Sequence, residues 1–135
     1  MTDIELVKKA KEAAKCSYSP YSGFTVGAAL LTKSGKVYLG CNIESASYSP
    51  TNCAERTAFF KAVSEGEREF EKIAVVGGKG LDFSDYCPPC GVCRQVMKEF
   101  CGEDFKVILG RNGDEVKVLT LGELLPYGFS LTDCP

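Results

Sequence analysis

The sequence predicts an α/β domain in which helices are layered on a mixed sheet of about five strands. Segments with apolar residues at helical spacing alternate along the chain with short runs rich in Val, Ile and Leu, which is the pattern of an α/β protein. Ser34-Gly35 lies between two apolar runs and predicts a tight turn in an antiparallel hairpin. The 135 residues contain no internal repeat, low-complexity segment or linker, so we expect a single domain over residues 1–135.

The first part of the chain predicts a helix followed by the hairpin. Thr2 and Glu5 form a capping box for a helix at 2–15, in which apolar residues recur every three or four positions. A turn-rich loop follows, and then two strands at 24–32 and at about 36–41.

The second part predicts two further helices and three strands. A polar loop at 42–52 leads to a helix at about 53–65, with Asn52 or Thr51 as its cap and Gly66 as its stop. The remaining predicted elements are a strand at 73–76 ended by Gly77-Gly78, a loop at 79–89, a helix at about 90–101, strands at 105–109 and 116–119, and a helical turn at 121–125. We expect a mainly parallel sheet after the opening hairpin.

Composition excludes several classes of function. The net charge of -2 and the pI near 5.2 argue against a partner that is a nucleic-acid polymer, because such proteins carry a basic patch. No apolar stretch approaches the ~20 residues of a membrane span, and the N-terminus has no signal-peptide pattern. Eight cysteines then indicate thiols or metal ligands rather than disulfides, and we expect a cytoplasmic protein without a membrane partner.

Cysteine spacing predicts a zinc site. The chain has no histidine, so proton transfer near neutral pH falls to a carboxylate, a thiol, a Lys or a Tyr. We interpret Cys53, Cys90 and Cys93 as three thiolate ligands of one Zn²⁺ ion per chain, with a water in the fourth position and Glu55 moving protons. Three protein ligands and one open position are typical of a catalytic zinc, whereas a structural zinc usually has four protein ligands.

Helix N-termini can bring these residues together. Cys53 and Glu55 are about 200° apart on a helical wheel, so they serve one centre only if it lies over the first turn. Pro88-Pro89 prevents helix before Cys90, which leaves Cys90 and Cys93 on one face of the next first turn. The partial positive charge of both helix ends favours thiolates.

Arg56 is the predicted partner of the sulfurs. Three thiolates leave the zinc site with an excess negative charge, and Arg56 could donate hydrogen bonds that draw electron density from them. The alternative is a solvated helix charge. Two alternatives also exist for the cysteines: Cys87 could close the site as a fourth ligand, or the C-x-x-C pair could be a redox motif. Two observations argue against Cys87 as a fourth ligand. The Pro88-Pro89 spacer between Cys87 and Cys90 is stiff, and Glu55 would have no role beside a zinc with four protein ligands. We interpret the other cysteines as simple thiols, namely Cys16, Cys41, Cys101 and Cys134.

The sequence also resembles a known family, the zinc nucleoside and nucleobase deaminases with their H-x-E…P-C-x-x-C signature. The first ligand here is Cys instead of His, as in the small homotetrameric cytidine deaminases. The motifs that carry the resemblance are Tyr18-Ser-Pro-Tyr-Ser-Gly-Phe24, Gly40-Cys-Asn42-Ile-Glu44, Thr51-Asn-Cys-Ala-Glu-Arg56, Pro89-Cys-Gly-Val-Cys-Arg-Gln95, and Leu124-Leu-Pro126 with Phe129. The segment 79–88 looks longer than expected, and Cys87 is unusual.

The resemblance implies a fold and a reaction. It implies a three-layer α/β/α sandwich and hydrolytic deamination of cytidine and deoxycytidine to uridine and deoxyuridine, with release of ammonia, in pyrimidine salvage. Zinc would activate a water, Glu55 would carry its proton to the cytosine and then to the leaving amino group, and the backbone at Ala54 would contact the base edge.

It also implies substrate contacts and an assembly. Asn42 and Glu44 would bind the ribose hydroxyls, with turn chemistry as the alternative for Asn42. Phe24 would pack on the pyrimidine; the alternative is that its side chain is simply buried in the hydrophobic core. Phe129 would stack on the substrate of a neighbouring subunit in a homotetramer, or else dock within its own chain. A deaminase for another base or a modified nucleoside, and a non-catalytic zinc-stabilised module, are the rival functions; RNA or DNA editing is disfavoured by charge.

Overall fold

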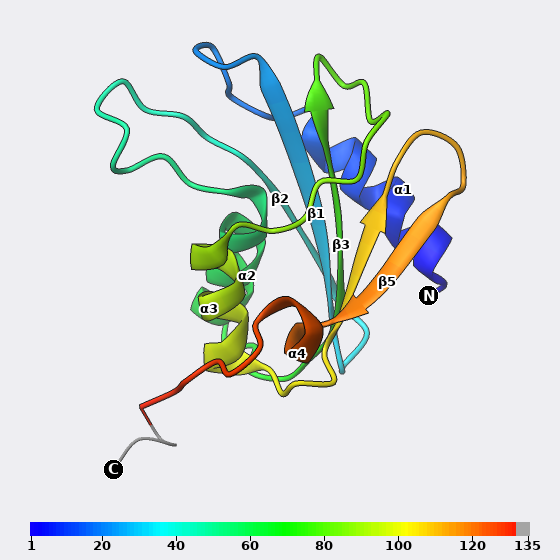
Figure 1. The fold of residues 1–135 in the computed structure, drawn as a ribbon, viewed down its shortest axis with the longest axis vertical. Helices are drawn as coiled ribbons and strands as arrows, with labels where there is room; N and C mark the ends of the chain where they lie inside the picture. The colour runs from blue at the N-terminus through cyan, green and yellow to red at the C-terminus, as the bar shows by residue number, and fades with distance from the viewer. Residues whose placement is uncertain (132–135) are drawn as a thin grey trace.

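The computed structural model describes residues 1–131 and has one five-stranded sheet with helices on both faces (Figure 1). The elements are α1 Asp3–Ala14, β1 Phe24–Thr32, β2 Val37–Cys41, α2 Ala54–Ser64, β3 Phe70–Lys79, α3 Gly91–Phe100, β4 Lys106–Gly110, β5 Val116–Thr120 and α4 Leu121–Leu124. Helix α1 covers one face of the sheet, and α2 and α3 cover the other. The predicted three-layer α/β arrangement around a mixed sheet is confirmed, and α1 has the predicted Thr2–Glu5 capping box.

The strand order is β2-β1-β3-β4-β5, and most neighbours in the described sheet are antiparallel. β1 pairs antiparallel with both β2 and β3, and β4 pairs antiparallel with β5. Among the strands of the described sheet only β3 and β4 pair in parallel, so the expectation of a mainly parallel sheet is wrong. At the β5 edge of the sheet the reason is local: the turn at 111–115 between β4 and β5 is too short for the crossover connection that parallel strands need. The predicted hairpin is correct.

Strand β3 is longer than the predicted run at 73–76, and the expected stop at Gly77-Gly78 is wrong. Gly77 and Gly78 lie inside the strand and pair with Val26 and Thr25 of β1. A Cβ added at Gly78 would lie 1.7 Å from the backbone oxygen of Asp82, so the chain after the strand crosses directly over this glycine. These glycines therefore permit a close crossing by the segment 80–89 instead of ending the strand.

Alternating side chains of β1 supply two cores. Ala28 and Leu30 face α2 and α3 in a cluster with Phe59 at its centre, where the ring of Phe59 packs against Phe70 with centroids 5.0 Å apart. The odd-numbered neighbours on β1 face α1 in the second cluster. This period-two alternation fixes which residues of each strand can reach the helix starts above the sheet.

Gly40 brings α2 close to β2. A Cβ at Gly40 would lie 2.3 Å from the backbone oxygen of Ala54 and 2.6 Å from the backbone nitrogen of Ala58. The first turn of α2 therefore rests on the strand backbone itself, which fixes the height of the helix start. Among residues 1–131 there is no helix with the length and apolar character that crossing a membrane requires.

Candidate metal centre

The N-cap of α2 is Cys53, and not the predicted Asn52 or Thr51. Asn52 is held in an extended bridge with Ile43, whose N–H donates to the Asn52 oxygen at 3.0 Å, while the Asn52 N–H donates back at 2.9 Å. Cys53 therefore becomes the N-cap, and within the described chain its side chain makes no capping hydrogen bond. Its sulfur stays available for another partner.

Helix α3 begins in the same way, with Cys90 as the N-cap and no capping hydrogen bond from its side chain in the described structure. Cys93 is the third helical residue and is buried. Arg94 fixes this first turn, because its Nε donates to the Pro89 oxygen and its Nη1 to the Leu124 oxygen, both at 2.7 Å. Two helix N-termini thus present cysteines toward one point.

The sulfurs of Cys53, Cys90 and Cys93 form a cluster within 4.8 Å of one another. The Sγ of Cys90 lies 3.6 Å from that of Cys53 and 3.5 Å from that of Cys93. Two sulfurs bound to tetrahedral zinc at ~2.3 Å would be about 3.8 Å apart. The spacing and the all-sulfur donor set therefore fit zinc, and a three-sulfur set leaves one coordination position for a non-protein ligand.

Cys87 does not belong to this cluster. Its Sγ packs over Gly77, 2.6 Å from where a Cβ on that glycine would lie, and the same point is 3.1 Å from the Phe24 ring. Among the described residues the metal-binding group contains three sulfurs, so the closed four-thiol alternative is not the arrangement found. Burial raises the pKa of the Cys87 thiol to about 11, which keeps it neutral.

Arg56 lies against the cluster. Its Nη2 donates to the Sγ of Cys53 at 3.3 Å, and its Nε is buried with no partner within residues 1–131. Although burial opposes it, the hydrogen bonds to Cys53 and Cys93 raise the pKa of Arg56, so the guanidinium stays charged. The hydrogen bond from Cys93 and then that from Arg56 lower the pKa of Cys53 to about 5 against burial. The hydrogen bond to Cys53 and burial raise the pKa of Cys93, so without metal the thiolate is on Cys53.

Glu55 is a buried carboxyl beside the sulfurs, with 4% of its surface exposed. Burial raises the pKa of Glu55 to about 7, with a further increase from the charge on Cys53 and opposing contributions from backbone hydrogen bonding and Arg56. A carboxyl whose pKa lies near neutrality can both accept and release a proton under ordinary conditions.

Two of the residues predicted to hold the substrate, Asn42 and Phe24, lie side by side. Asn42 donates from Nδ2 to the Phe24 oxygen at 2.8 Å, and its Oδ1 accepts from the Val26 N–H at 2.9 Å and from the Ser17 hydroxyl. The structure thus places the Asn42 amide at the start of β1, beside Phe24. Ala54, the first residue of α2, is fully buried.

Glu44 is engaged by the loop before β1. Its Oε1 accepts from the N–H groups of Tyr21 and Ser22 at 3.1 and 3.2 Å, and its Oε2 accepts from the Ser22 hydroxyl. The Ser22 hydrogen bond lowers the pKa of Glu44, which stays ionised. This carboxylate therefore organises the loop next to Phe24, and free lone pairs remain for another donor.

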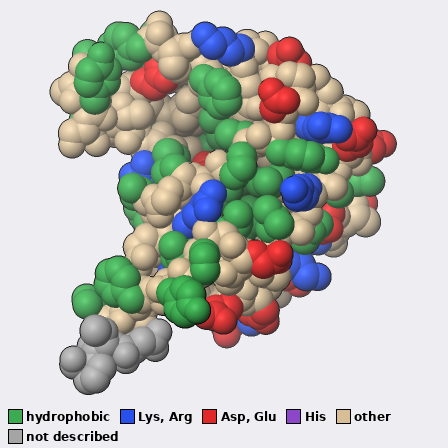
Figure 2. All heavy atoms as spheres, in the orientation of Figure 1, with side chains coloured by type: hydrophobic (Ala, Val, Ile, Leu, Met, Phe, Trp, Pro, Cys, Tyr) green, Lys and Arg blue, Asp and Glu red, His purple; other side chains and the backbone are tan. Residues whose placement is uncertain are grey.

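Phe129 lies in the C-terminal tail, outside the cluster of thiols. Its side chain is 60% exposed, and its backbone oxygen accepts from Gln95 Nε2 of α3 at 3.0 Å. The neighbouring Tyr127 and Leu131 are also exposed. The tail runs away from the sheet, and apolar side chains stand out along it (Figures 1 and 2). Cys134 lies outside the described residues.

Two residues with structural roles at the site were not singled out from the sequence. Thr57 Oγ1 donates to the backbone oxygen of Cys41 at 3.0 Å and accepts from Asn52 Nδ2 at 3.1 Å, which ties the start of α2 to the end of β2. Arg94 fixes the start of α3. Arg94 was present in the P-C-x-x-C-R-Q motif, but its two carbonyl acceptors come from segments that only the fold brings near.

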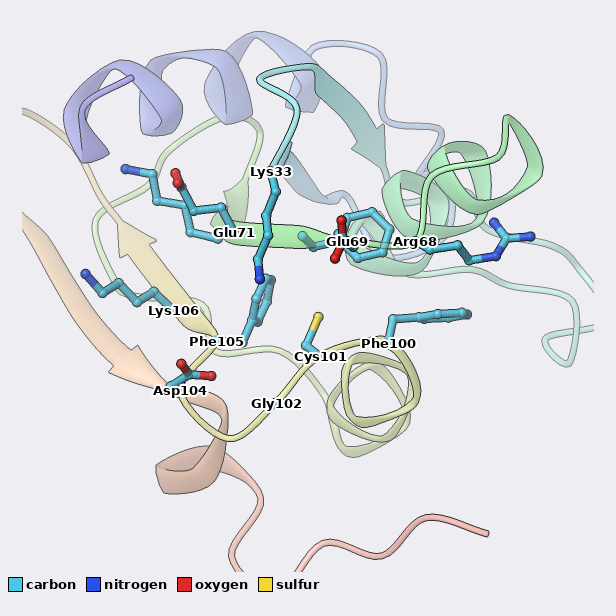
Figure 3. Close-up of a pocket in the computed structure, with 12 residues that line it drawn as sticks. Lys33, Arg68, Glu69, Glu71, Phe100, Cys101, Gly102, Asp104, Phe105 and Lys106 are labelled. Carbon is cyan, nitrogen blue, oxygen red and sulfur yellow. The ribbon is translucent and has the colours of Figure 1, made fainter. Parts of the chain in front are cut away.

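Cavities occur at both ends of α3. One, of about 380 Å³, lies just before the helix and is lined by Phe24, Gly77 and Cys87, together with the charged residues Lys79, Asp82 and Asp85. Another, of about 600 Å³, lies at the C-terminal end of the helix, where Lys33 reaches toward Cys101 and Phe105 (Figure 3). Neither lining includes Cys53, Glu55, Cys90 or Cys93, so the sulfur cluster itself, and not a cavity, marks the candidate site.

A three-sulfur zinc centre with a buried carboxyl beside it defines a zinc-dependent hydrolase. Residues 1–109 match the family described as the cytidine and deoxycytidylate deaminase zinc-binding region, and the chain belongs to this family. The cytidine deaminase of Halalkalibacterium halodurans is 53% identical over 95% of this chain and 94% of that protein. The cytidine deaminase of Sporosarcina psychrophila is 49% identical over 97% of this chain and 94% of that protein.

A solved structure has the same fold. The crystal structure of cytidine deaminase from Burkholderia pseudomallei is similar to this chain with a TM-score of 0.88 and 48% sequence identity. The match covers 96% of this chain and all of that one. The family expected from the sequence, its α/β fold and its zinc cofactor are confirmed.

Proposed function

We propose that this chain hydrolyses cytidine and deoxycytidine to uridine and deoxyuridine with release of ammonia. The observation that carries the proposal is the three-sulfur cluster at zinc spacing with buried Glu55 beside it. The similarity to cytidine deaminases over nearly the whole chain supports cytidine as the substrate. The eight thiols favour the cytoplasm as the site of action.

In the proposed mechanism Cys53, Cys90 and Cys93 hold the metal, and Glu55 moves the protons. Zinc, when bound, supplies Lewis acidity that lowers the pKa of a water toward ~7. Glu55 would accept a proton from the attacking water and deliver it to the ring nitrogen of cytosine, while the water oxygen adds to the ring carbon that bears the amino group. Glu55 would then take the remaining hydroxyl proton and give it to the amino group, which leaves as ammonia. Arg56 offsets the excess negative charge of three thiolates through its contact with Cys53.

Substrate binding is assigned to the region at the start of β1. Phe24 would pack on the pyrimidine, and the backbone at Ala54 would contact the base edge. Asn42 and Glu44 would bind the ribose hydroxyls, since both side chains are already oriented by hydrogen bonds. Asn42 has one Nδ2 N–H left to donate, and Glu44 has acceptor capacity left at Oε2. Orientation in advance reduces the entropy lost on binding.

We also propose a homotetramer in which Phe129 completes a neighbouring site. Phe129, Tyr127 and Leu131 are all exposed on one short tail, and a run of exposed apolar residues marks an interaction surface. Gln95 holds the tail backbone at a fixed place on α3, so its side chains are presented rather than docked into their own domain. Sedimentation analysis of the wild-type chain and of Phe129→Ala, together with their KM values, tests this assignment.

Ultraviolet monitoring of cytidine, deoxycytidine and free cytosine with zinc-replete protein tests the reaction. We expect turnover of both nucleosides and none of cytosine, because the sugar contacts would be missing. The matched control is Glu55→Gln, which should bind one zinc per chain and lose turnover. Activity retained in Glu55→Gln would refute the mechanism, and zinc binding without turnover in the wild type would favour a zinc-stabilised module.

A deaminase for another base or a modified nucleoside remains the second candidate. Glu44→Ala separates the two, because a substrate without ribose would be indifferent to this change. If cytidine is the substrate, the variant should lose kcat/KM mainly through a higher KM for ribosides.

A further inference from the structure

Two thiols outside the metal cluster share a groove at the β2 edge of the sheet. The groove has a volume of about 300 Å³ and is lined from the end of α1, from β2 and from α2. Cys16 and Cys41 both line it; Cys16 is exposed and Cys41 is half-buried. The reaction proposed above uses neither of them.

Strand pairing places the Cys41 side chain beside the end of α1. Cys41 is the cross-strand partner of Gly27, and directly opposed residues point to the same face of a sheet. A Cβ at Gly27 would lie 2.0 Å from the Ala10 oxygen and 2.6 Å from the Ala14 nitrogen, so that face carries the last turn of α1. Cys16 directly follows this turn, and its N–H donates to the Ala13 oxygen at 3.0 Å.

A second pairing aligns the two segments themselves. Tyr18 and Ile43 form a parallel bridge, in which the Tyr18 N–H donates to the Asn42 oxygen at 3.0 Å. Each cysteine precedes its bridge residue by two positions, so the segments 16–18 and 41–43 run side by side in one direction. Paired strands lie about 4.8 Å apart, within the Cα separation that a disulfide spans.

The difference in exposure indicates which of the two thiols, Cys16 or Cys41, reacts first. Burial and then the nearby Cys16 raise the pKa of Cys41, with an opposing contribution from Lys61. The interaction between the two thiols agrees with their common position in the groove. Cys16 is the thiol that solvent and small molecules reach first, and Cys41 is the one that lies behind it.

We propose that Cys16 and Cys41 form a thiol modification site that takes low-molecular-weight disulfides and is converted to an internal disulfide. The Cys16 thiolate attacks one sulfur of the small disulfide, a mixed disulfide forms, and one small thiolate leaves. The Cys41 thiolate, after loss of its proton to solvent, attacks the Cys16 sulfur, and the second small thiolate leaves. The protein loses two hydrogen atoms, and the small disulfide is reduced to two thiols.

The Cys16–Cys41 disulfide would affect nucleoside binding through Ser17 and Asn42, the residues that directly follow the two cysteines. Ser17 donates its hydroxyl hydrogen bond to Asn42 Oδ1, and Asn42 in turn holds the Phe24 oxygen. A covalent bond between the preceding residues would displace this contact. This consequence rests on the proposed role of Asn42 in ribose binding. We expect oxidation to raise KM for cytidine roughly tenfold, which is the size of effect expected for one lost hydrogen bond, with a smaller change in kcat.

Mass spectrometry of zinc-loaded protein treated with oxidised glutathione tests the site directly. We expect the loss of two hydrogen atoms per chain and a bond between the tryptic peptides 16–33 and 37–56. Because Cys53 lies in the same peptide as Cys41, fragment ions must place the bond at Cys41. Cys16→Ser should form no internal bond, Cys41→Ser should stop at a glutathione adduct on Cys16, and Cys101→Ser should behave like the wild type. A wild-type adduct that persists on Cys16, or a bond at Cys53, would overturn the proposal.

Kinetics of the same samples test the link to binding. KM of the oxidised wild type should rise and return to its starting value with a reductant, while Cys16→Ser should not respond. An internal bond with unchanged KM would overturn the link to Asn42. The mass measurement gives its answer whether or not cytidine is the substrate, so the modification site and the proposed function fail separately.

Discussion

Cysteine occurs at both ends of α3, and the two ends have opposite chemistry. At the N-terminus, the Cys90 sulfur lies 3.5 Å from that of Cys93 and 3.6 Å from that of Cys53, the N-cap of α2. At the C-terminus, Cys101 is the only thiol among residues 1–131 that lines its cavity, and burial raises its pKa to about 12. A thiol becomes a ligand here because a helix start, an arginine and a second helix converge on it; residue type alone does not suffice.

The largest expected effect separates the two ends by removing one thiol from each. We expect Cys93→Ala to lose zinc, because only two of the three sulfur ligands remain. Its kcat/KM should then fall by about 10³-fold or more. Cys101→Ser should keep one zinc per chain and near wild-type activity. Metal analysis and turnover of both variants check the difference; zinc retained in Cys93→Ala would contradict the assignment of the ligands.

A second comparison adds a methyl group at two glycines, one beneath the start of α2 and one after the end of α3. Gly40→Ala would push its Cβ into the backbone of α2, 2.3 Å from the Ala54 oxygen, and should reduce the free energy of unfolding by about 3 kcal/mol. Gly102→Ala meets the flexible Asp104 side chain at 3.1 Å and should be close to neutral. Urea denaturation measures both, and equal stability of the two variants would be the contrary result.

A third test removes the arginine that donates to the Cys53 sulfur. Arg56→Gln should keep zinc but lower kcat/KM by about 10–100-fold, since the thiolates lose a charged hydrogen-bond partner. Arg68→Gln changes an exposed arginine that lines the cavity at the other end of α3; it is the matched control and should show no loss. An unaffected kcat/KM in Arg56→Gln would assign Arg56 to the solvated alternative.

The smallest effect concerns thiol reactivity in zinc-free protein. Cys101, with a pKa of about 12, should react with iodoacetamide about tenfold faster for each pH unit between 7 and 9, because its thiolate fraction rises in that proportion. Cys53, with a pKa of about 5, is already ionised above pH 7, so its rate should stay flat. Site-resolved mass spectrometry follows both; a flat rate at Cys101 would contradict its burial.

Local patterns in the sequence predicted the elements well. The Thr2–Glu5 capping box, the hairpin at Ser34-Gly35 and the helix start after Pro88-Pro89 all depend on neighbouring residues, and all are found. The spacing of the three cysteines predicted their convergence, because helix first turns restrict where those side chains can lie.

Features set by distant segments were not predictable in this way. Asn52 is not the cap of α2 because Ile43 holds it in a bridge, and Gly77 continues β3 because β1 pairs with it on one side. The antiparallel character of the sheet follows from β3 lying beside β1. Arg94 depends on a carbonyl thirty positions away in sequence. Each of these is a long-range partner that competes with a local preference.

Both helices above the sheet begin at a cysteine whose side chain leaves the first backbone N–H groups without a capping oxygen. A single ion bound by those side chains would anchor the first turns of α2 and α3 together, so the two helices should fray together when it is removed. Amide hydrogen exchange at 54–56 and 91–93 would then accelerate in parallel on chelation, while the sheet beneath stays protected. The mouth of the catalytic pocket would thus be the part of the fold that senses whether the enzyme is loaded.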